Sequence, residues 1–199
     1  MRQETEGVTE ALLESAKKEF LKYGFRDASL RRISANSGVS TNSIYTRFKD
    51  KAGLFSAVVK NAAEGLMEIY VNSTHTASEC ESVSSVNDEG TRGMEKVVKY
   101  VYENFDEFFL IFCRSQGTEY EEYFDRLAEI EEGFYKKFVK QYAQNSNVDD
   151  FFIHVYCRTG WQYLYELLSH GKSYEEAEKF MKNVNKAQIA GWNAVMYGK

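Results

Sequence analysis

Proline, cysteine and long hydrophobic runs are absent or scarce in this sequence. None of the 199 residues is proline, so no helix is interrupted by the residue that breaks helices most strongly. The three cysteines, Cys80, Cys113 and Cys157, lack Cys-x-x-Cys spacing, which favours reduced thiols over a disulfide framework. No apolar run approaches the roughly 18 residues of a membrane span, and residues 1–7 are polar rather than a signal peptide. We therefore expect a cytoplasmic protein that does not enter a membrane.

Residues that could hold a metal or carry out catalysis are also few. His154 and Cys157 lie three positions apart on a predicted helix, but a zinc site needs further ligands, so packing is the better interpretation. The three histidines are scattered, and neither a nucleophile with its base nor a glycine-rich phosphate loop is recognisable. We expect no catalytic residue, no metal and no cofactor.

The residues that are present favour an all-α protein. The chain is 43% hydrophobic, 28% charged and 15% aromatic, a composition typical of a folded domain. Apolar residues recur every three or four positions, which is the period of an amphipathic helix. The first such stripe consists of Val8, Leu12, Ala16, Phe20 and Tyr23, and it stops at Gly24.

Charge is distributed unevenly along the chain. Residues 1–60 carry 11 Lys and Arg against 7 Asp and Glu, whereas residues 61–199 carry 14 against 23. A basic end and an acidic end suit a protein that places its N-terminal part on a phosphate backbone.

Residues 29–51 have the pattern of a helix-turn-helix. Ser29 and Ser40 are suitable N-caps for two short helices. Between these helices Gly38 tolerates the left-handed backbone of a tight turn, and Ile44 of the second helix points inward. The second helix could then lie in a DNA major groove, which is roughly 12 Å wide.

Several short motifs in this region resemble the N-terminal signature of the TetR family of transcription regulators. They are Gly24-Phe25, Ser29-Leu30-Arg31-Arg32-Ile33, Ser37-Gly38-Val39-Ser40, Ile44-Tyr45-Thr46-Arg47-Phe48 and Lys51-Ala52-Gly53-Leu54-Phe55. The resemblance spans residues 8–60. It implies a homodimer of about nine helices per chain that binds a palindromic double-stranded DNA operator. Most such proteins repress transcription until a small molecule in the C-terminal domain moves the two DNA-reading heads apart.

The same resemblance implies roles for individual residues. Tyr45 and Lys51 match phosphate contacts, with Ser29 and Ser40 presenting further donors to the DNA backbone. The positions that reach base edges, or share that face of the second helix, are Arg31, Thr41, Asn42, Ser43, Thr46 and Arg47. Arginine can read guanine and asparagine can read adenine in the major groove.

We expect two domains: a three-helix DNA-binding domain at residues 1–52, and a larger helical bundle for ligand sensing and dimerisation at residues 53–199. Residues 75–93 are rich in Ser, Thr, Glu and Asn, which predicts a flexible loop there. The last two predicted helices, residues 150–170 and 173–197, carry more apolar residues than one core contact needs. We therefore expect a dimer interface that includes Val155, Ala177, Met181, Val184, Gly191 and Val195.

Aromatic residues of the second domain could form its core or line a cavity for an apolar or aromatic effector. The candidates are Phe109, Phe112, Tyr123, Phe134, Trp161 and Tyr165. A run of acidic residues could attract a cationic ligand, although its spacing is more typical of the solvated face of a helix. That run consists of Glu119, Glu121, Glu122, Asp125, Glu129, Glu131 and Glu132.

The sequence therefore favours a ligand-responsive, sequence-specific DNA-binding regulator, most simply a repressor. The alternative is a constitutive or architectural DNA-binding dimer that senses no small molecule. An enzyme is the third possibility, but no residues in the sequence indicate catalysis. An aromatic-lined cavity in the second domain favours the sensor, and a fully packed core there favours the constitutive binder.

Overall fold

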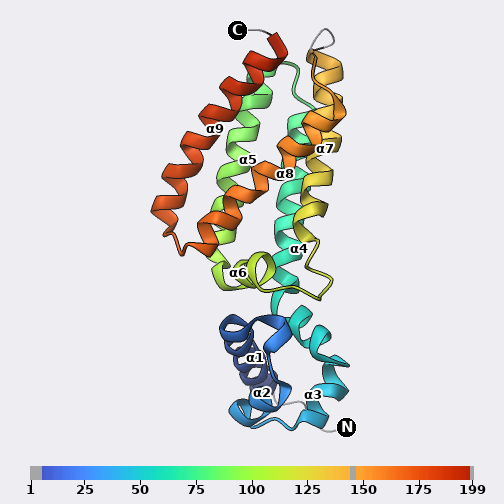
Figure 1. The fold of residues 1–199 in the computed structure, drawn as a ribbon, viewed down its shortest axis with the longest axis vertical. Helices are drawn as coiled ribbons and strands as arrows, with labels where there is room; N and C mark the ends of the chain where they lie inside the picture. Colours follow the sequence, from blue (N-terminus) through green and yellow to red (C-terminus); the bar gives the residue numbers. More distant parts are fainter. Residues whose placement is uncertain (1–5, 144–146, 198–199) are drawn as a thin grey trace. The chain divides into compact units, whose positions relative to one another are not determined.

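A computed structural model describes residues 6–143 and 147–197, and every regular element in this part of the chain is a helix (Figure 1). The all-α prediction and the expected number of about nine helices are confirmed. The nine helices are α1 (Glu6–Asp27), α2 (Leu30–Ser37), α3 (Thr41–Phe48), α4 (Lys51–Ser78), α5 (Val83–Glu103), α6 (Phe105–Cys113), α7 (Tyr123–Tyr142), α8 (Asp150–Ser169) and α9 (Tyr174–Tyr197). None of them is long and apolar enough to cross a membrane.

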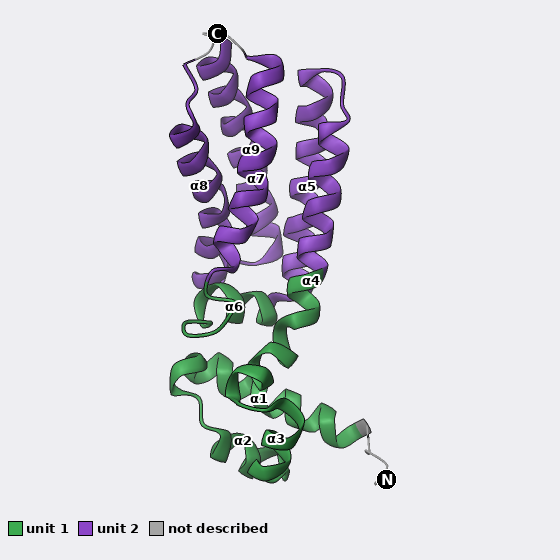
Figure 2. Cartoon of the chain, turned by 90° about the vertical axis from the view of Figure 1, so that its right-hand side faces the viewer, with its two compact units in different colours: residues 1–64, 106–121 green, residues 65–105, 122–199 purple. Residues whose placement is uncertain are grey.

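The helices form two compact units (Figure 2). The first contains the chain up to Glu64 together with Asp106–Glu121, and the second contains Gly65–Phe105 together with the chain from Glu122 onward. Helix α4 therefore contributes its first half to one unit and its second half to the other. The expected functional boundary after residue 52 concerns DNA binding and stays a prediction.

The first unit is built on the apolar stripe of α1. Leu12 and Phe20 are fully buried, as are Ile33 of α2 and Ile44 of α3. At Gly24 the backbone leaves the helical conformation, with φ at 72°, so the main part of α1 ends where its apolar stripe stops.

Ion pairs and a hydrogen bond connect the segment 106–121 to the rest of this unit. The Lys17 ammonium lies 2.8 Å from Glu107 Oε1 and 3.3 Å from Asp106 Oδ2. The Tyr120 hydroxyl lies 2.9 Å from the hydroxyl of Ser56 on α4. These contacts join residues that are far apart in sequence, so α6 and the loop after it belong to the N-terminal helices in packing.

The second unit contains five helical segments. Helix α7 packs along α8, and α5 packs along α9. Leu127, Ile153 and Leu168 are among its fully or almost fully buried side chains. Ser173 and Glu176 form a capping pair at the start of α9: the Ser173 N–H donates to Glu176 Oε2 at 2.9 Å, and the Glu176 N–H donates to Ser173 Oγ at 3.2 Å.

The predicted loop over residues 75–93 is wrong as secondary structure, because α4 continues to Ser78 and α5 begins at Val83. The hydroxyl of Thr76 donates to the carbonyl oxygen four residues earlier, which lets a polar side chain remain in a helix. Ser82 and Ser85 cap each other's backbone N–H at the start of α5. The polar composition marks the exposed side of two helices rather than a break between them.

Candidate functional site

The helix-turn-helix in the first unit has the caps that its sequence predicts. Ser29 Oγ accepts a hydrogen bond from the backbone N–H of Arg32, and Ser40 Oγ accepts one from Ser43 N at 3.1 Å. Gly38 has φ at 71°, and no atom lies near the position of a Cβ there. Its role is therefore to supply the left-handed backbone of the turn.

The predicted DNA-contacting residues divide into two groups. The side chains of Arg31, Asn42 and Tyr45 are exposed, and none of the three takes part in a recorded hydrogen bond or ion pair of the described residues; Tyr45 is 53% exposed. Thr41 is half-buried. The remaining side chains have partners within the chain: Ser29, Ser40, Ser43, Thr46, Arg47 and Lys51.

Arg47 connects the recognition helix α3 to α1. Its Nη1 donates to the hydroxyl of Thr9 at 2.7 Å. To read a base edge, the guanidinium would have to give up or share this contact.

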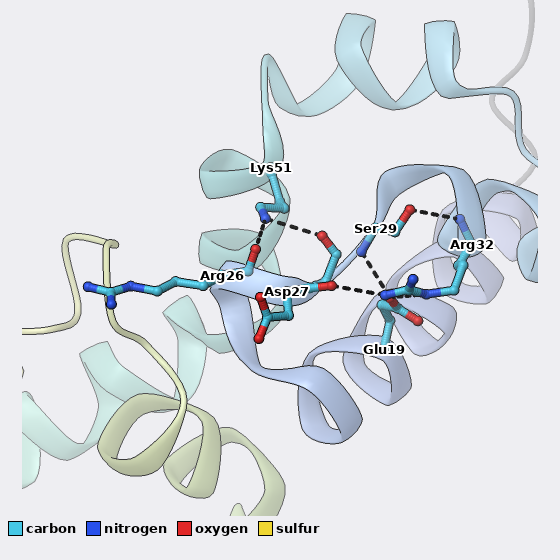
Figure 3. A network of polar contacts seen from close by, with 7 residues as sticks. Glu19, Arg26, Asp27, Ser29, Arg32 and Lys51 are labelled. Carbon is cyan, nitrogen blue, oxygen red and sulfur yellow. Dashed lines mark hydrogen bonds and ion pairs between the residues drawn. The ribbon is translucent and has the colours of Figure 1, made fainter.

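Lys51 caps the C-terminal end of α1 with hydrogen bonds (Figure 3). Its ammonium donates to the carbonyl oxygens of Arg26 at 2.9 Å and Ala28 at 3.2 Å, and it lies 4.8 Å from the centre of the Phe25 ring. The last carbonyl groups of a helix lack partners within it and carry partial negative charge, so a cation is stabilising there. This structural role adds to the phosphate contact predicted from the sequence.

A nearly buried carboxylate holds α1 against α2 (Figure 3). Glu19 is 6% exposed, and its Oε1 accepts hydrogen bonds from Arg32 Nε at 2.7 Å and from Ser29 N at 2.9 Å. The hydrogen bond that Arg32 donates to Glu19 raises the pKa of the Arg32 guanidinium above its ordinary value. Arg32 is thereby used inside the fold, whereas its neighbour Arg31 is exposed. Sequence reasoning missed this pair, although an acidic residue beside the buried stripe of α1 is a signal for it.

The second unit contains a partly open cavity of about 190 Å³. Its walls come from α4, α5, α7, α8 and α9, and they include Tyr70, Phe134, Tyr135, Phe138, Trp161 and Trp192. The rings of Tyr70 and Trp161 meet edge to face with centres 4.9 Å apart, and those of Tyr135 and Trp192 stack at 4.8 Å. Of the predicted pocket residues, Phe134 and Trp161 lie in this wall.

The other four predicted pocket residues do not line this cavity. Phe109 and Phe112 lie on α6 in the first unit, where the Arg114 guanidinium lies 5.5 Å from the centre of the Phe109 ring. Tyr123 is buried at the start of α7, and Tyr165 is half-buried on α8. Helical spacing identifies an apolar face but cannot say which neighbour that face meets, and this is the reason for the error.

Sequence reasoning also missed several members of the wall. Tyr70, Tyr135 and Trp192 line the cavity together with Glu131, which the sequence pattern assigns to a solvated face. Glu131 precedes Phe134 by three positions and so shares its side of α7. The three-residue spacing to Phe134 is the sequence signal that places Glu131 on the cavity side, and considering only the acidic residues did not reveal it.

The match to a family model covers the helix-turn-helix and the helices on either side of it. Residues 12–58 match the model described as bacterial regulatory proteins, tetR family. This segment is therefore similar to the DNA-binding region of TetR-family transcription regulators.

Several solved structures share the fold of nearly the whole chain, whereas no curated protein matches it. A TetR-like transcriptional regulator from Rhodococcus sp. RHA1 is 17% identical over 96% of this chain and 100% of its own, with a TM-score of 0.63. The TetR-family regulator PfmR from Thermus thermophilus is 21% identical over 94% of each chain, with a TM-score of 0.59. NalD, the secondary repressor of the MexAB-OprM multidrug efflux pump in Pseudomonas aeruginosa, is 15% identical over 98% of this chain and 96% of its own, with a TM-score of 0.55. At these identities the likeness establishes the fold.

The residues predicted for the dimer interface differ in exposure. Val155 and Val195 are each 46% exposed, Gly191 is exposed and Val184 is half-buried. The predictions for Ala177 and Met181 are wrong for this chain, because both side chains are buried within it and Met181 lines the cavity. Both lie on the inward face of α9, which the sequence pattern did not separate from its outward face.

His154 and Cys157 form no metal site, as no group of His, Cys, Asp and Glu in the described part of the chain could hold a metal ion. His154 Nδ1 lies 2.7 Å from Glu132 Oε1, which is also 2.6 Å from Arg158 Nη1. Cys157 is a buried free thiol. Both residues therefore serve packing and surface charge pairing.

Proposed function

We propose that this protein represses transcription by binding a palindromic operator as a homodimer, and that a small molecule in the cavity of the second unit releases it from DNA. The observation that carries the DNA-binding part is the capped helix α3 with exposed, unengaged side chains at its surface. Arg31 and Asn42 are suited to guanine and adenine edges, and the Tyr45 hydroxyl is suited to a phosphate oxygen.

The proposed dimer forms through α8 and α9 as a four-helix packing around a two-fold axis. Phe151 is 73% exposed, and Val155, one turn further along α8, is 46% exposed. On α9, Phe180 is 40% exposed and Val195 is 46% exposed. Apolar side chains exposed at helical spacing on two adjacent helices of one unit support a partner surface.

The cavity supports ligand sensing over the constitutive alternative. A domain that only dimerises has no need of an unfilled interior, and interiors are normally packed to the density of organic crystals. An aromatic-lined space of about 190 Å³ exceeds the ~150 Å³ apolar cavity that takes up benzene in an engineered protein. The proposed effector is accordingly an apolar or aromatic small molecule.

Selection of genomic DNA fragments that the protein binds tests the DNA-binding proposal directly. A palindromic consensus bound at two chains per site is expected. Recovery of fragments without any shared sequence would contradict the operator and favour an architectural binder.

The dimer is tested by light scattering on Val155→Glu and Val195→Glu. Each variant is expected to be monomeric with unchanged helical content. Lys186→Glu is the matched control, because Lys186 is exposed and lies half a turn around α9 from Val195. If both variants remain dimeric, the interface lies elsewhere.

A further inference from the structure

Glu131 of α7 faces the cavity of the second unit and has no cationic partner among the described residues. It lines the cavity beside Tyr70, Tyr135 and Trp161. A Cβ added at Gly160 of α8 would lie 3.8 Å from Glu131 Oε2. The carboxyl of Glu131 therefore lies opposite Gly160, where α8 leaves room because glycine has no side chain.

The charges around the cavity do not balance. Its wall contains two carboxylates, Glu89 and Glu131, and none of the described residues that line it is Lys, Arg or His. Glu89 is neutralised by Arg92, whose Nη2 and Nε lie 2.7 Å and 2.8 Å from Glu89 Oε2. No ion pair is recorded for Glu131 in the described part of the chain. The cavity thus holds one uncompensated acidic group.

Burial makes this group costly to ionise in the empty cavity. Desolvation raises the pKa of Glu131 to about 8, and the donor groups of Trp161 and Tyr70 beside it offset only part of this effect. The other titratable groups that interact with it are Tyr70 of α4, Tyr135 of α7, and Tyr156 and Cys157 of α8. None of these becomes a cation, so the described groups around Glu131 supply no counter-charge.

Aromatic rings from four helices line the cavity around this carboxyl. Tyr70 meets Trp161 edge to face, and Tyr135 stacks on Trp192. The faces of Trp and Tyr attract cations, and a cluster of such rings is a recurrent site for quaternary and protonated amines.

We propose that the effector is a small organic cation, a protonated or quaternary amine on an apolar or aromatic body, whose nitrogen pairs with the Glu131 carboxylate. The inference rests on the proposed role of this cavity as the effector site, and it names the chemistry of the effector. The volume of about 190 Å³ limits the body to roughly one ring system, because pockets for drug-sized ligands start near 300 Å³.

Two probes of the same shape separate charge from apolar burial. Phenyltrimethylammonium carries a fixed positive charge, and tert-butylbenzene replaces its nitrogen with carbon. Binding of each to the full-length protein is measured by titration calorimetry, with Glu131→Gln as the test variant and Glu129→Gln as the control. Glu129 lies on the same helix and is exposed.

The cation is expected to bind the unaltered protein and Glu129→Gln alike, and to bind Glu131→Gln at least tenfold more weakly. The neutral probe should bind Glu131→Gln at least as tightly as the unaltered protein. Affinity for the cation should also rise about tenfold per pH unit up to about pH 8 and then level off, because the probe has no proton of its own to lose. Glu131→Gln should abolish that rise.

The inference is overturned if Glu131→Gln loses affinity for both probes equally, or if it leaves the affinity for the cation unchanged. It is also overturned if the cation fails to bind the unaltered protein. Binding of the neutral probe alone would leave the cavity as an effector site and reject only the cationic class. Operator binding without any probe is measured separately by fluorescence anisotropy, so failure of the proposed DNA-binding function is recognised independently.

Discussion

Replacing Glu131 with glutamine should stabilise the protein, and the gain should grow with pH. In the folded chain the pKa of Glu131 is about 8, against an ordinary value of 4.5. Between these two pH values the folded state holds the proton while the unfolded chain releases it, so folding becomes less favourable as pH rises. Glutamine has a similar shape and no proton to lose, so the stability of the variant does not fall with pH for this reason.

The magnitude follows from the pKa difference. One pKa unit corresponds to about 1.4 kcal/mol, so 2.5 units between 4.5 and pH 7 give at most about 3.5 kcal/mol per chain. The cavity is partly open, and water that enters it reduces the desolvation. We therefore expect Glu131→Gln to gain about 1–3 kcal/mol over the unaltered protein at pH 7, relative to their difference below pH 4.5.

Urea unfolding at fixed protein concentration from pH 4 to pH 8.5 measures this difference, with concentration held constant because association shifts apparent stability. The free-energy gap between the two proteins should widen from pH 4.5 to 8 and then remain constant. Glu129→Gln serves as the control and should run parallel to the unaltered protein. Parallel curves for Glu131→Gln would refute the argument that the carboxyl is buried without a counter-charge.

Further outcomes are expected for four variants. In anisotropy titrations, Asn42→Ala should lose about 1–3 kcal/mol of binding free energy on the operator and little on random DNA. Lys51→Ala should lower the affinity for both DNAs, and it should flatten the slope of log affinity against log salt concentration by about one unit, because one phosphate contact is lost. Urea unfolding should show that Lys51→Ala also loses about 1 kcal/mol of stability, because the end of α1 loses its cation. Gly53→Ala should cost about 1–3 kcal/mol in the same assay, since its Cβ would overlap the carbonyl oxygen of Phe48; unchanged stability would contradict this. Gly160→Ala should raise the melting temperature, with a gain of up to about 1 kcal/mol, yet weaken cation binding, because its methyl group meets no clash but occupies cavity space.

Local features of the DNA-binding head were predictable because each depends on neighbouring residues in the sequence. Ser29 and Ser40 cap the helices that follow them, and Gly38 adopts the left-handed conformation of the turn. The predicted inward positions Ile33 and Ile44 are fully buried. A cap, a turn glycine and an apolar period are set within a few residues, so a single sequence contains the information.

Assignments that depend on which helix packs against which were less successful. Ala177 and Val195 both lie on apolar positions of α9, but the first is fully buried and the second is exposed. Phe109 and Phe134 are equally apolar, yet only Phe134 lines the cavity, since α6 packs in the other unit. Helical period gives the faces of one helix, whereas the distribution of those faces among core, cavity and partner is a property of the whole packing.

The hydrogen bonds of Arg47 and Lys51 bear on how the head distinguishes its operator from other DNA. A side chain that leaves a partner within the protein for a DNA atom loses one hydrogen bond as it gains another, so the hydrogen bond itself adds little to binding, and the contribution of a cation is then mainly its attraction to phosphate, which does not depend on sequence. Arg47 has Thr9 as a partner, and Lys51 has the carbonyl oxygens of Arg26 and Ala28. Asn42 has no side-chain partner among the described residues, so every hydrogen bond that it makes with a base replaces only water. Base discrimination is therefore expected to depend more on Asn42 than on Arg47, although arginine is the more common reader of DNA.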